Sequence, residues 1–156
     1  MGTVIMHSVV SVDGFIADEH DDVGPLHDWY FNGDTPITEG GDQQYDHSGA
    51  GSGLKVSHAS AEYVRPIRAA IGTIVMGRNL FDLVNGWERT VSVNAGEVGS
   101  QILAAGLVDE VAMDVVPVVF GSGKRYFGSI EGQHLPEDPH VVIQGDRVLH
   151  LRFKVR

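Results

Sequence analysis

The chain has 156 residues, 42% of them hydrophobic, and a formal net charge of −10 from 11 basic and 21 acidic residues. This length and composition suit one domain, residues 1–156, around a single core, and the acidic balance argues against binding nucleic acid through its phosphates. The absence of cysteine excludes disulfides, thiolate nucleophiles and thiolate metal sites, and it favours an intracellular setting.

The N-terminal stretch, residues 1–15, lacks a basic region followed by a long apolar segment, and no run in the chain approaches the roughly 18 apolar residues of a membrane span. We therefore expect a cytoplasmic protein with no membrane partner.

Residues 3–12 are apolar except at a few positions, which predicts a strand covered on both faces and central in a sheet. Asp13-Gly14 follows at the carboxyl end of that strand, where ligands gather in open α/β sheets.

Residues 18–56 are acidic and then rich in glycine and serine, which predicts a long, lid-like loop with one helical turn around Asp28. The adjacent Trp29, Tyr30 and Phe31 are costly to leave in water, so we expect either that one of them lines a cleft or subunit contact, or that they pack on the core. A metal site in this loop is the weaker alternative to solvated charge, and we predict no metal. Its ligands would come from His20, Asp21, Asp22, His27 and Asp28.

The middle of the chain predicts a helix over residues 57–71, capped by Ser57 or Ser60 and kinked at Pro66. Two strand-to-helix connections follow it, one at residues 73–78 and one at residues 90–97. Each helix start offers free backbone donors and the positive end of a dipole, so two of them at one sheet edge could hold the two ends of a dinucleotide. At the first start, Arg78 would add its guanidinium, or would form a structural ion pair.

The last third predicts a helix that ends near Gly106, with Ile102, Leu103 and Leu107 on its buried side, and a strand over residues 110–120. Pro117 should break the pairing of that strand before a glycine turn at residues 121–123. Residues 140–144 and 147–156 predict an antiparallel hairpin around Gly145-Asp146. In its second strand Leu149, Leu151 and Phe153 alternate with polar residues, so we expect one dry face and a polar face that meets solvent or a partner.

Three segments in this order, SVDGFIA (residues 11–17), IVMGRNLFD (74–82) and AAGLVDEVAMDVVPVVFGSGKRYF (104–127), resemble the dihydrofolate reductase-like family. The nearest branch is the reductase domain of the bifunctional deaminase-reductases of bacterial riboflavin biosynthesis. The resemblance implies an α/β three-layer sandwich with a mostly parallel central sheet and an antiparallel C-terminal hairpin. It also implies an NADPH-dependent reductase, often a homodimer. Such an enzyme transfers a hydride to a C=N or C=O group of a small pterin-like or pyrimidine-ribosylamine-like substrate.

Site residues follow from the resemblance. Asp13 is the expected catalytic residue, with a turn-forming role as the alternative. The expected cofactor-binding residues are Ser11, Gly14, Ile16, Ala17, Gly77, Arg78, Asn79, Ala95, Gly96, Glu97 and Val98. The expected substrate-binding residues are Trp29, Phe81, Pro117, Gly121 and Gly123. Asp114 is a further acid candidate, because burial would raise its pKa, although a carboxylate bonded to backbone is the commoner explanation.

Two departures from the family weaken this interpretation. The family usually has Gly-Gly where this chain has Ala95-Gly96, and the methyl group could narrow the approach to a phosphate. Between Trp87 and Thr90 the chain also lacks an edge strand-helix-strand unit that carries the adenine and 2′-phosphate contacts of the family. The alternative function is therefore a non-catalytic nucleotide-binding or dimerisation module that keeps the reductase fold.

Overall fold

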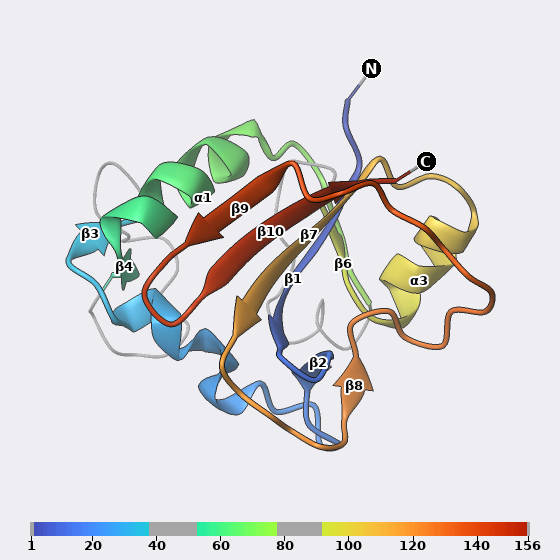
Figure 1. Ribbon diagram of the computed structural model, residues 1–156, viewed down its shortest axis with the longest axis horizontal. Coiled ribbons are helices and arrows are strands. Elements are labelled where there is room, and N and C mark those ends of the chain that lie inside the picture. Colours follow the sequence, from blue (N-terminus) through green and yellow to red (C-terminus); the bar gives the residue numbers. More distant parts are fainter. Residues whose placement is uncertain (1, 38–52, 78–91, 156) are drawn as a thin grey trace.

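A computed structural model describes residues 2–37, 53–77 and 92–155. Its centre is a six-stranded sheet in the order β5-β6-β1-β7-β10-β9 (Figure 1). The strands of this sheet are β1 (Ile5–Ser11), β5 (Ile74–Val75), β6 (Ser92–Asn94), β7 (Glu110–Val116), β9 (Val141–Gln144) and β10 (Leu149–Lys154). Strands β5, β6, β1 and β7 run parallel, whereas β10 is antiparallel to β7 and β9. The predicted fold class, with its antiparallel C-terminal hairpin, is confirmed, and β5 is the outer strand on its side among the described residues.

Both faces of β1 are covered, as its apolar run predicted. Val9 belongs to a cluster on the face of helix α1 (His58–Ala70), and Met6 and Val10 belong to a cluster on the face of helix α3 (Glu97–Ala104). The two helices lie on opposite sides of the sheet (Figure 1). Each fully buried aliphatic side chain of this kind contributes about 1.5–3 kcal/mol relative to exposure, so the central strand anchors the three layers.

Ser57 caps the start of helix α1, and its hydroxyl accepts a hydrogen bond from the backbone amide of Ser60 at 3.3 Å. This confirms the predicted helix and one of its two candidate caps. Pro66 lies inside the helix, where it lacks the amide that would bond to the preceding turn. The helix ends at Ile71, whose backbone has left the helical region.

The segment predicted as a lid-like loop has more structure than expected where it is described. Pro25 opens a 3-10 helix, η1 (Gly24–Phe31), and the two-residue strands β3 (Thr35–Pro36) and β4 (Lys55–Val56) pair antiparallel. Leu26 and Trp29 from η1 join the core cluster on the α1 face. The described part of this segment is therefore anchored to the sheet by apolar packing.

Two burial predictions were wrong. Leu107 is 62% exposed, because α3 ends at Ala104 and Gly106, with φ +71°, turns the chain outward before Leu107. On the polar face of β10 the prediction was wrong for His150, which is 0% exposed, and right for Lys154, which is exposed. Helix α1 covers His150. Its ring bonds to Ser60 and Asp114 inside the protein instead of meeting the solvent that the alternating pattern predicted.

Candidate active site

The carboxyl end of β1 turns sharply into the short strand β2 (Phe15–Ala17). Gly14 sits in this turn with φ +91° and donates its amide to the Ser11 carbonyl at 3.0 Å. A side chain would be strained at this φ, yet a Cβ at Gly14 would have nothing within 4 Å. The backbone here is therefore open to an approaching group. We call residues Ser11–Ala17 the lip.

Asp13 holds the lip to the turn that follows β7. Its carboxylate accepts hydrogen bonds from the Ser11 hydroxyl at 2.6 Å, from the Gly121 amide at 2.7 Å and from the Phe120 amide at 3.1 Å. The Ser11 hydroxyl and these two amides together lower the pKa of Asp13 below its usual range. Asp13 is therefore deprotonated and bound to backbone, which fits the turn-forming alternative better than a proton donor.

Tyr126 connects the lip to the start of α3, and sequence reasoning did not single it out. Its amide donates to the Gly14 carbonyl at 2.9 Å, and its own carbonyl accepts from the Gly96 amide at 2.7 Å. Its ring is 1% exposed, and its hydroxyl donates toward the carbonyls of Ala112 and Met6 at 2.7 and 3.1 Å. Burial raises the pKa of Tyr126 well above its usual value, so the hydroxyl stays neutral. The only signal for this role in the sequence was the GSGKRYF motif.

The start of α3 lies against the lip. Gly96 adopts φ +94°, and a Cβ there would stand 3.2 Å from the Ile16 side chain. No described residue accepts a hydrogen bond from the amides of Glu97 or Val98, the first two residues of the helix. Gly77, just past β5, lies beside Val98, because a Cβ at Gly77 would be 3.6 Å from that side chain. The structure thus brings Gly77, Gly96 and the lip together at the carboxyl ends of neighbouring parallel strands.

Two features reduce the attraction of this helix start for an anion. The Gly96 amide is already bound to Tyr126, and the carboxylate of Glu97 lies in the first turn, where it accepts from the Ser129 hydroxyl at 2.8 Å. Gly128 packs closely over the same turn, since a Cβ there would lie 3.0 Å from the Glu97 nitrogen. Of the first amides of α3, the one that remains for a phosphate is that of Val98, which lies beside Gly77.

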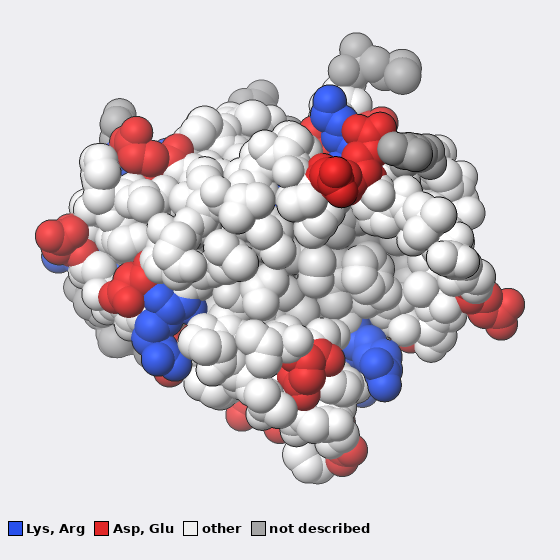
Figure 2. Space-filling view, viewed as in Figure 1, with Lys and Arg blue, Asp and Glu red and all other residues white. Residues whose placement is uncertain are grey.

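The turn after β7 closes over β2 through the strand β8 (Lys124–Arg125), which pairs antiparallel with β2. Gly123 is required there, because a Cβ would lie 2.2 Å from the Ala17 carbonyl oxygen. The Arg125 guanidinium lies 5.2 Å from the centre of the Phe15 ring. Figure 2 shows one of the few basic groups on this face over the position of β8. Lys124 and Arg125 of β8 therefore place positive charge next to the lip.

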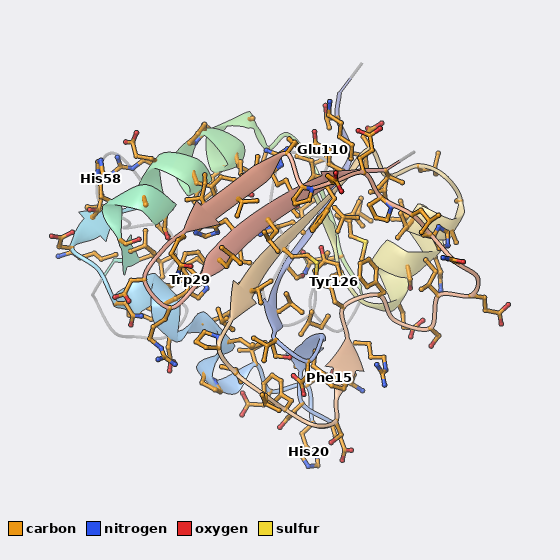
Figure 3. The ribbon with its side chains drawn as sticks, viewed as in Figure 1. Phe15, His20, Trp29, His58, Glu110 and Tyr126 are labelled. Carbon is orange, nitrogen blue, oxygen red and sulfur yellow. The ribbon has the colours of Figure 1, made fainter. Side chains whose placement is uncertain are left out.

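Several predicted site residues do not face this region. Ser11 is 2% exposed with its hydroxyl bound to Asp13, and Ala95 is 8% exposed inside the core cluster of the α3 face. Trp29 is 2% exposed, and Figure 3 shows it beneath the C-terminal hairpin, far from Phe15 of the lip. Its ring stacks on Tyr30 and makes a T-shaped contact with His150, so it packs inside the protein. These three assignments are corrected to structural roles.

The remaining assignments divide in two. Pro117 ends β7 and is exposed, and Gly121 gives its amide to Asp13, so both lie in the turn beside the lip. The other three predicted residues, Arg78, Asn79 and Phe81, lie outside the described residues, as does the connection from Trp87 to Thr90. No group of three histidine or carboxylate side chains gathers around a possible metal position in the described ranges.

Sequence reasoning also missed a chain of buried polar side chains beneath α1. The Ser60 hydroxyl lies 2.9 Å from Nε2 of His150, Nδ1 of His150 lies 2.6 Å from one oxygen of Asp114, and the other oxygen lies 2.8 Å from Nε2 of His7. Ser60, His150 and Asp114 are at most 1% exposed, whereas the His7 side chain is 31% exposed. The order resembles a catalytic serine-histidine-aspartate set, but the serine is sealed from any substrate.

Asp114 was expected to have a raised pKa, and the structure shows the opposite. Burial alone would raise the pKa, but the charge of His7 and hydrogen bonds from His150 and His7 outweigh it and hold the pKa of Asp114 well below its usual range. In turn, Asp114 raises the pKa of His7 above 6.5 against the opposing effect of burial. Asp114 therefore stays a carboxylate and is no acid.

Comparison with known proteins supports the fold. No family model and no curated protein matches the sequence. A protein from Shewanella sp. PV-4 assigned to riboflavin biosynthesis aligns over 100% of this chain and 99% of its own, with a TM-score of 0.62 and 14% identity. The diaminohydroxyphosphoribosylaminopyrimidine deaminase/5-amino-6-(5-phosphoribosylamino)uracil reductase of Thermotoga maritima aligns over 99% of this chain, with a TM-score of 0.51 and 16% identity. RibD from Acinetobacter baumannii aligns over 100% of this chain, with a TM-score of 0.51 and 14% identity.

The chain spans 56% and 58% of the Thermotoga and Acinetobacter proteins, respectively. At these identities the similarity shows a shared fold, which is the α/β architecture that the sequence predicted. No described helix is long and apolar enough to cross a membrane.

Proposed function

We propose that this chain is an NADPH-dependent reductase that transfers a hydride to a C=N or C=O group of a small pterin-like or pyrimidine-ribosylamine-like substrate. One observation carries the proposal. Tyr126 bonds to Gly14 and to Gly96, and so fixes the lip beside a helix start at the carboxyl ends of β1 and β6. Ligands bind at this end of open α/β sheets. The shared fold with a Thermotoga maritima protein named as a uracil-derivative reductase supports the substrate class.

The described residues fit a dinucleotide in part. Gly14 and Ile16 would border the nicotinamide, where the lip leaves its backbone open at Gly14, whereas Ala17 is 7% exposed and lies under the turn at Gly123. The amide of Val98 would take a phosphate beside Gly77. The bound cofactor supplies the hydride, and the chain's own part is to hold the ring at the lip and to keep water away from it.

NADPH binding can be tested with a variant that should bind better. The Glu97 carboxylate lies in the first turn of α3, whose start would take a phosphate, so Glu97→Gln should tighten NADPH binding about fivefold, the effect of roughly 1 kcal/mol of charge repulsion at a partly exposed site. Titration of the protein with NADPH, followed by nicotinamide fluorescence, gives the dissociation constants. Glu62→Gln, at an exposed carboxylate on α1, is the matched control and should leave the constant unchanged. Absence of saturable binding at millimolar NADPH would refute the reductase.

A second function is favoured by the state of Asp13. Because this carboxylate is deprotonated and fully bonded, and Ser11 is buried, the lip offers no side-chain proton donor among the described residues. A module that binds the nucleotide without turnover would show the saturable fluorescence change. It would show no loss of absorbance at the NADPH band when candidate pterin or pyrimidine substrates are added. A reductase should show both the saturable fluorescence change and the loss of NADPH absorbance.

A further inference from the structure

Helix α1, which lies along the β9 edge of the sheet (Figure 1), is attached to the sheet mainly through its first half. The buried residues of the helix all lie in that half: Ser60, Ala61 and Tyr63. None of residues 64–70 is buried. A groove of about 640 Å³ lies between α1 and the sheet, and Pro66 and Ile67 are in its wall. An element with few buried contacts opens more easily than the sheet beneath it, so the first half decides whether α1 stays in place.

Ser60 ties this half of the helix to the centre of the sheet through hydrogen bonds whose direction can be assigned. The pKa of Asp114 is well below its usual range, so its oxygens accept from Nε2 of His7 at 2.8 Å and from Nδ1 of His150 at 2.6 Å. A neutral His150 then accepts the Ser60 hydroxyl at Nε2, 2.9 Å away. Ser60 in turn accepts from the hydroxyl of the cap residue Ser57 at 3.1 Å. The chain of bonds therefore runs from the start of α1 to β1.

His7 is the end of this chain that solvent can reach. Its side chain is 31% exposed and lies in the wall of the groove, whereas Asp114 and His150 are at most 1% exposed. A proton can therefore enter or leave the network at His7. A neutral His7 can still donate from Nε2, but the buried charge of Asp114 then has no cation in contact, and the bond between them weakens.

Charged and titratable groups face His7 from α1, β7 and β10. They are Glu62, Tyr63, Arg68, Glu110, Asp114, His150 and Arg152. Burial and the two arginines lower the pKa of His7, but the charge of Asp114 and its hydrogen bond outweigh them and raise it above 6.5. Glu110 pairs with Arg152, and burial raises the pKa of Tyr63 far above its usual value, so that hydroxyl stays neutral. The partner that sets the charge of His7 is thus Asp114.

We propose that the chain Ser60-His150-Asp114-His7 is a pH-sensitive switch for α1, which holds the helix on the sheet while His7 carries a proton and lets it open locally when that proton is lost. Opening of α1 admits water around His7 and Asp114 and screens their attraction. The raised pKa of His7 belongs to the closed state, so the switch holds fully below pH 6.5 and is released as the pH rises through the closed-state value. The switch does not depend on the proposed reductase activity.

Hydrogen exchange of the full chain, followed by NMR between pH 6 and 8.5 and corrected for intrinsic exchange rates, measures the opening. We expect the amides of Tyr63 and Val64 to be less protected than those in the middle of β7, because the helix opens without the sheet. The glutamine of His7→Gln keeps a donor near the position of Nε2 and does not titrate. Relative to this variant, protection of α1 in the wild type should fall at least about fivefold over the pH range, the difference between a charge-assisted and an ordinary hydrogen bond.

His134→Gln, the same substitution at an exposed histidine, is the matched control and should keep the wild-type profile. In the wild type, the fall in protection should have the same midpoint as the NMR titration of the His7 ring, a comparison that needs no variant. Equal protection of α1 and β7 would show that the helix does not open by itself, and would overturn the proposal. So would parallel profiles for wild type and His7→Gln, or a midpoint that differs from that of the His7 ring.

Discussion

At the scale of single residues, Asp114 joins elements that are far apart in sequence. Its two carboxylate oxygens bind His7 on β1 and His150 on β10, and His150 reaches Ser60 on α1. A carboxylate in this position is stable only because both oxygens have partners, since an unpaired buried charge costs several kcal/mol. The group that looked like a possible acid is thus a link between the sheet and its covering helix.

Replacement of Asp114 should test this link. Asp114→Asn keeps the shape but removes the charge that the two histidines share, and we expect the free energy of unfolding to fall by about 3 kcal/mol. Urea denaturation at neutral pH measures the change. Asp138→Asn, at an exposed position, serves as the control and should change stability by less than about 0.5 kcal/mol. A loss in Asp114→Asn no larger than in the control would contradict the role assigned to the network.

The network around Asp114 makes the free energy of unfolding depend on pH, and Asp114 and His7 contribute in opposite directions. The pKa of Asp114 is lowered in the folded state, so its contribution is present above its usual value of 3.8 and is lost as the pH falls. The pKa of His7 is raised, so its contribution is full below 6.5 and is lost as the pH rises through the folded value. His27, whose pKa is lowered by burial, acts in the opposite sense to His7.

We therefore expect the wild-type free energy of unfolding, measured in urea, to decrease between pH 6.5 and 8.5 relative to that of His7→Asn. The His27 contribution is common to both proteins and cancels in the difference. His134→Asn, an exposed histidine, is the control and should keep the wild-type profile. Parallel profiles for wild type and His7→Asn would show that His7 does not gain a proton on folding.

Residue chemistry of this kind could not be predicted from the sequence, and the reason is physical. The sequence shows that Asp114 alternates with apolar residues, but not that the β1-β7-β10 order places two histidines beside it. Desolvation and pairing act in opposite directions on a pKa, and only the pairing depends on long-range register. Likewise, the run Trp29-Tyr30-Phe31 did not reveal which ring is buried, and the answer is Trp29, with Phe31 58% exposed.

At the scale of elements, local signals were sufficient for β1, α1 and the end of α3. The apolar run of β1 gave a central strand, Ser57 gave the start of α1, and Gly106 gave the stop after α3. Each of these depends on residues close together in the chain, such as a cap or a turn that needs glycine. The exposure predicted for His150 on β10 was wrong, because its burial depends on α1, an element almost a hundred residues earlier in the chain.

The start of α3 offers a prediction at this scale. Gly96 combines φ +94° with ψ −155°, a region that side chains avoid, and a Cβ would crowd Ile16 at 3.2 Å. Gly96→Ala should lower the free energy of unfolding by about 1–3 kcal/mol and should weaken NADPH binding, because the helix start would move relative to the lip. Urea denaturation and NADPH titration report the two effects. Gly2→Ala, where a Cβ meets nothing within 4 Å, is the control, and equal stability of the two variants would contradict the strain argument.

At the scale of the whole molecule, the sheet ends in a strand that is available for pairing. β9 is the outer strand beside β10, and no described residue pairs with its other side. Its Val142 is 59% exposed, and an exposed apolar edge strand is a template for pairing with another chain. We propose that the homodimer implied by the family resemblance forms here, through β9 of two copies related by a twofold axis.

Lysine on an edge strand opposes such pairing, because its charge would be desolvated in the interface. Val142→Lys should therefore weaken dimerisation at least about tenfold, as measured by sedimentation velocity over a range of protein concentrations. Val119→Lys introduces the same charge at a residue that is 72% exposed in the turn after β7, and it should leave the association unchanged. If Val119→Lys separates the subunits and Val142→Lys does not, the interface lies beside the lip. A wild-type chain that sediments as a monomer at all concentrations would rule out the homodimer itself, whichever surface was considered.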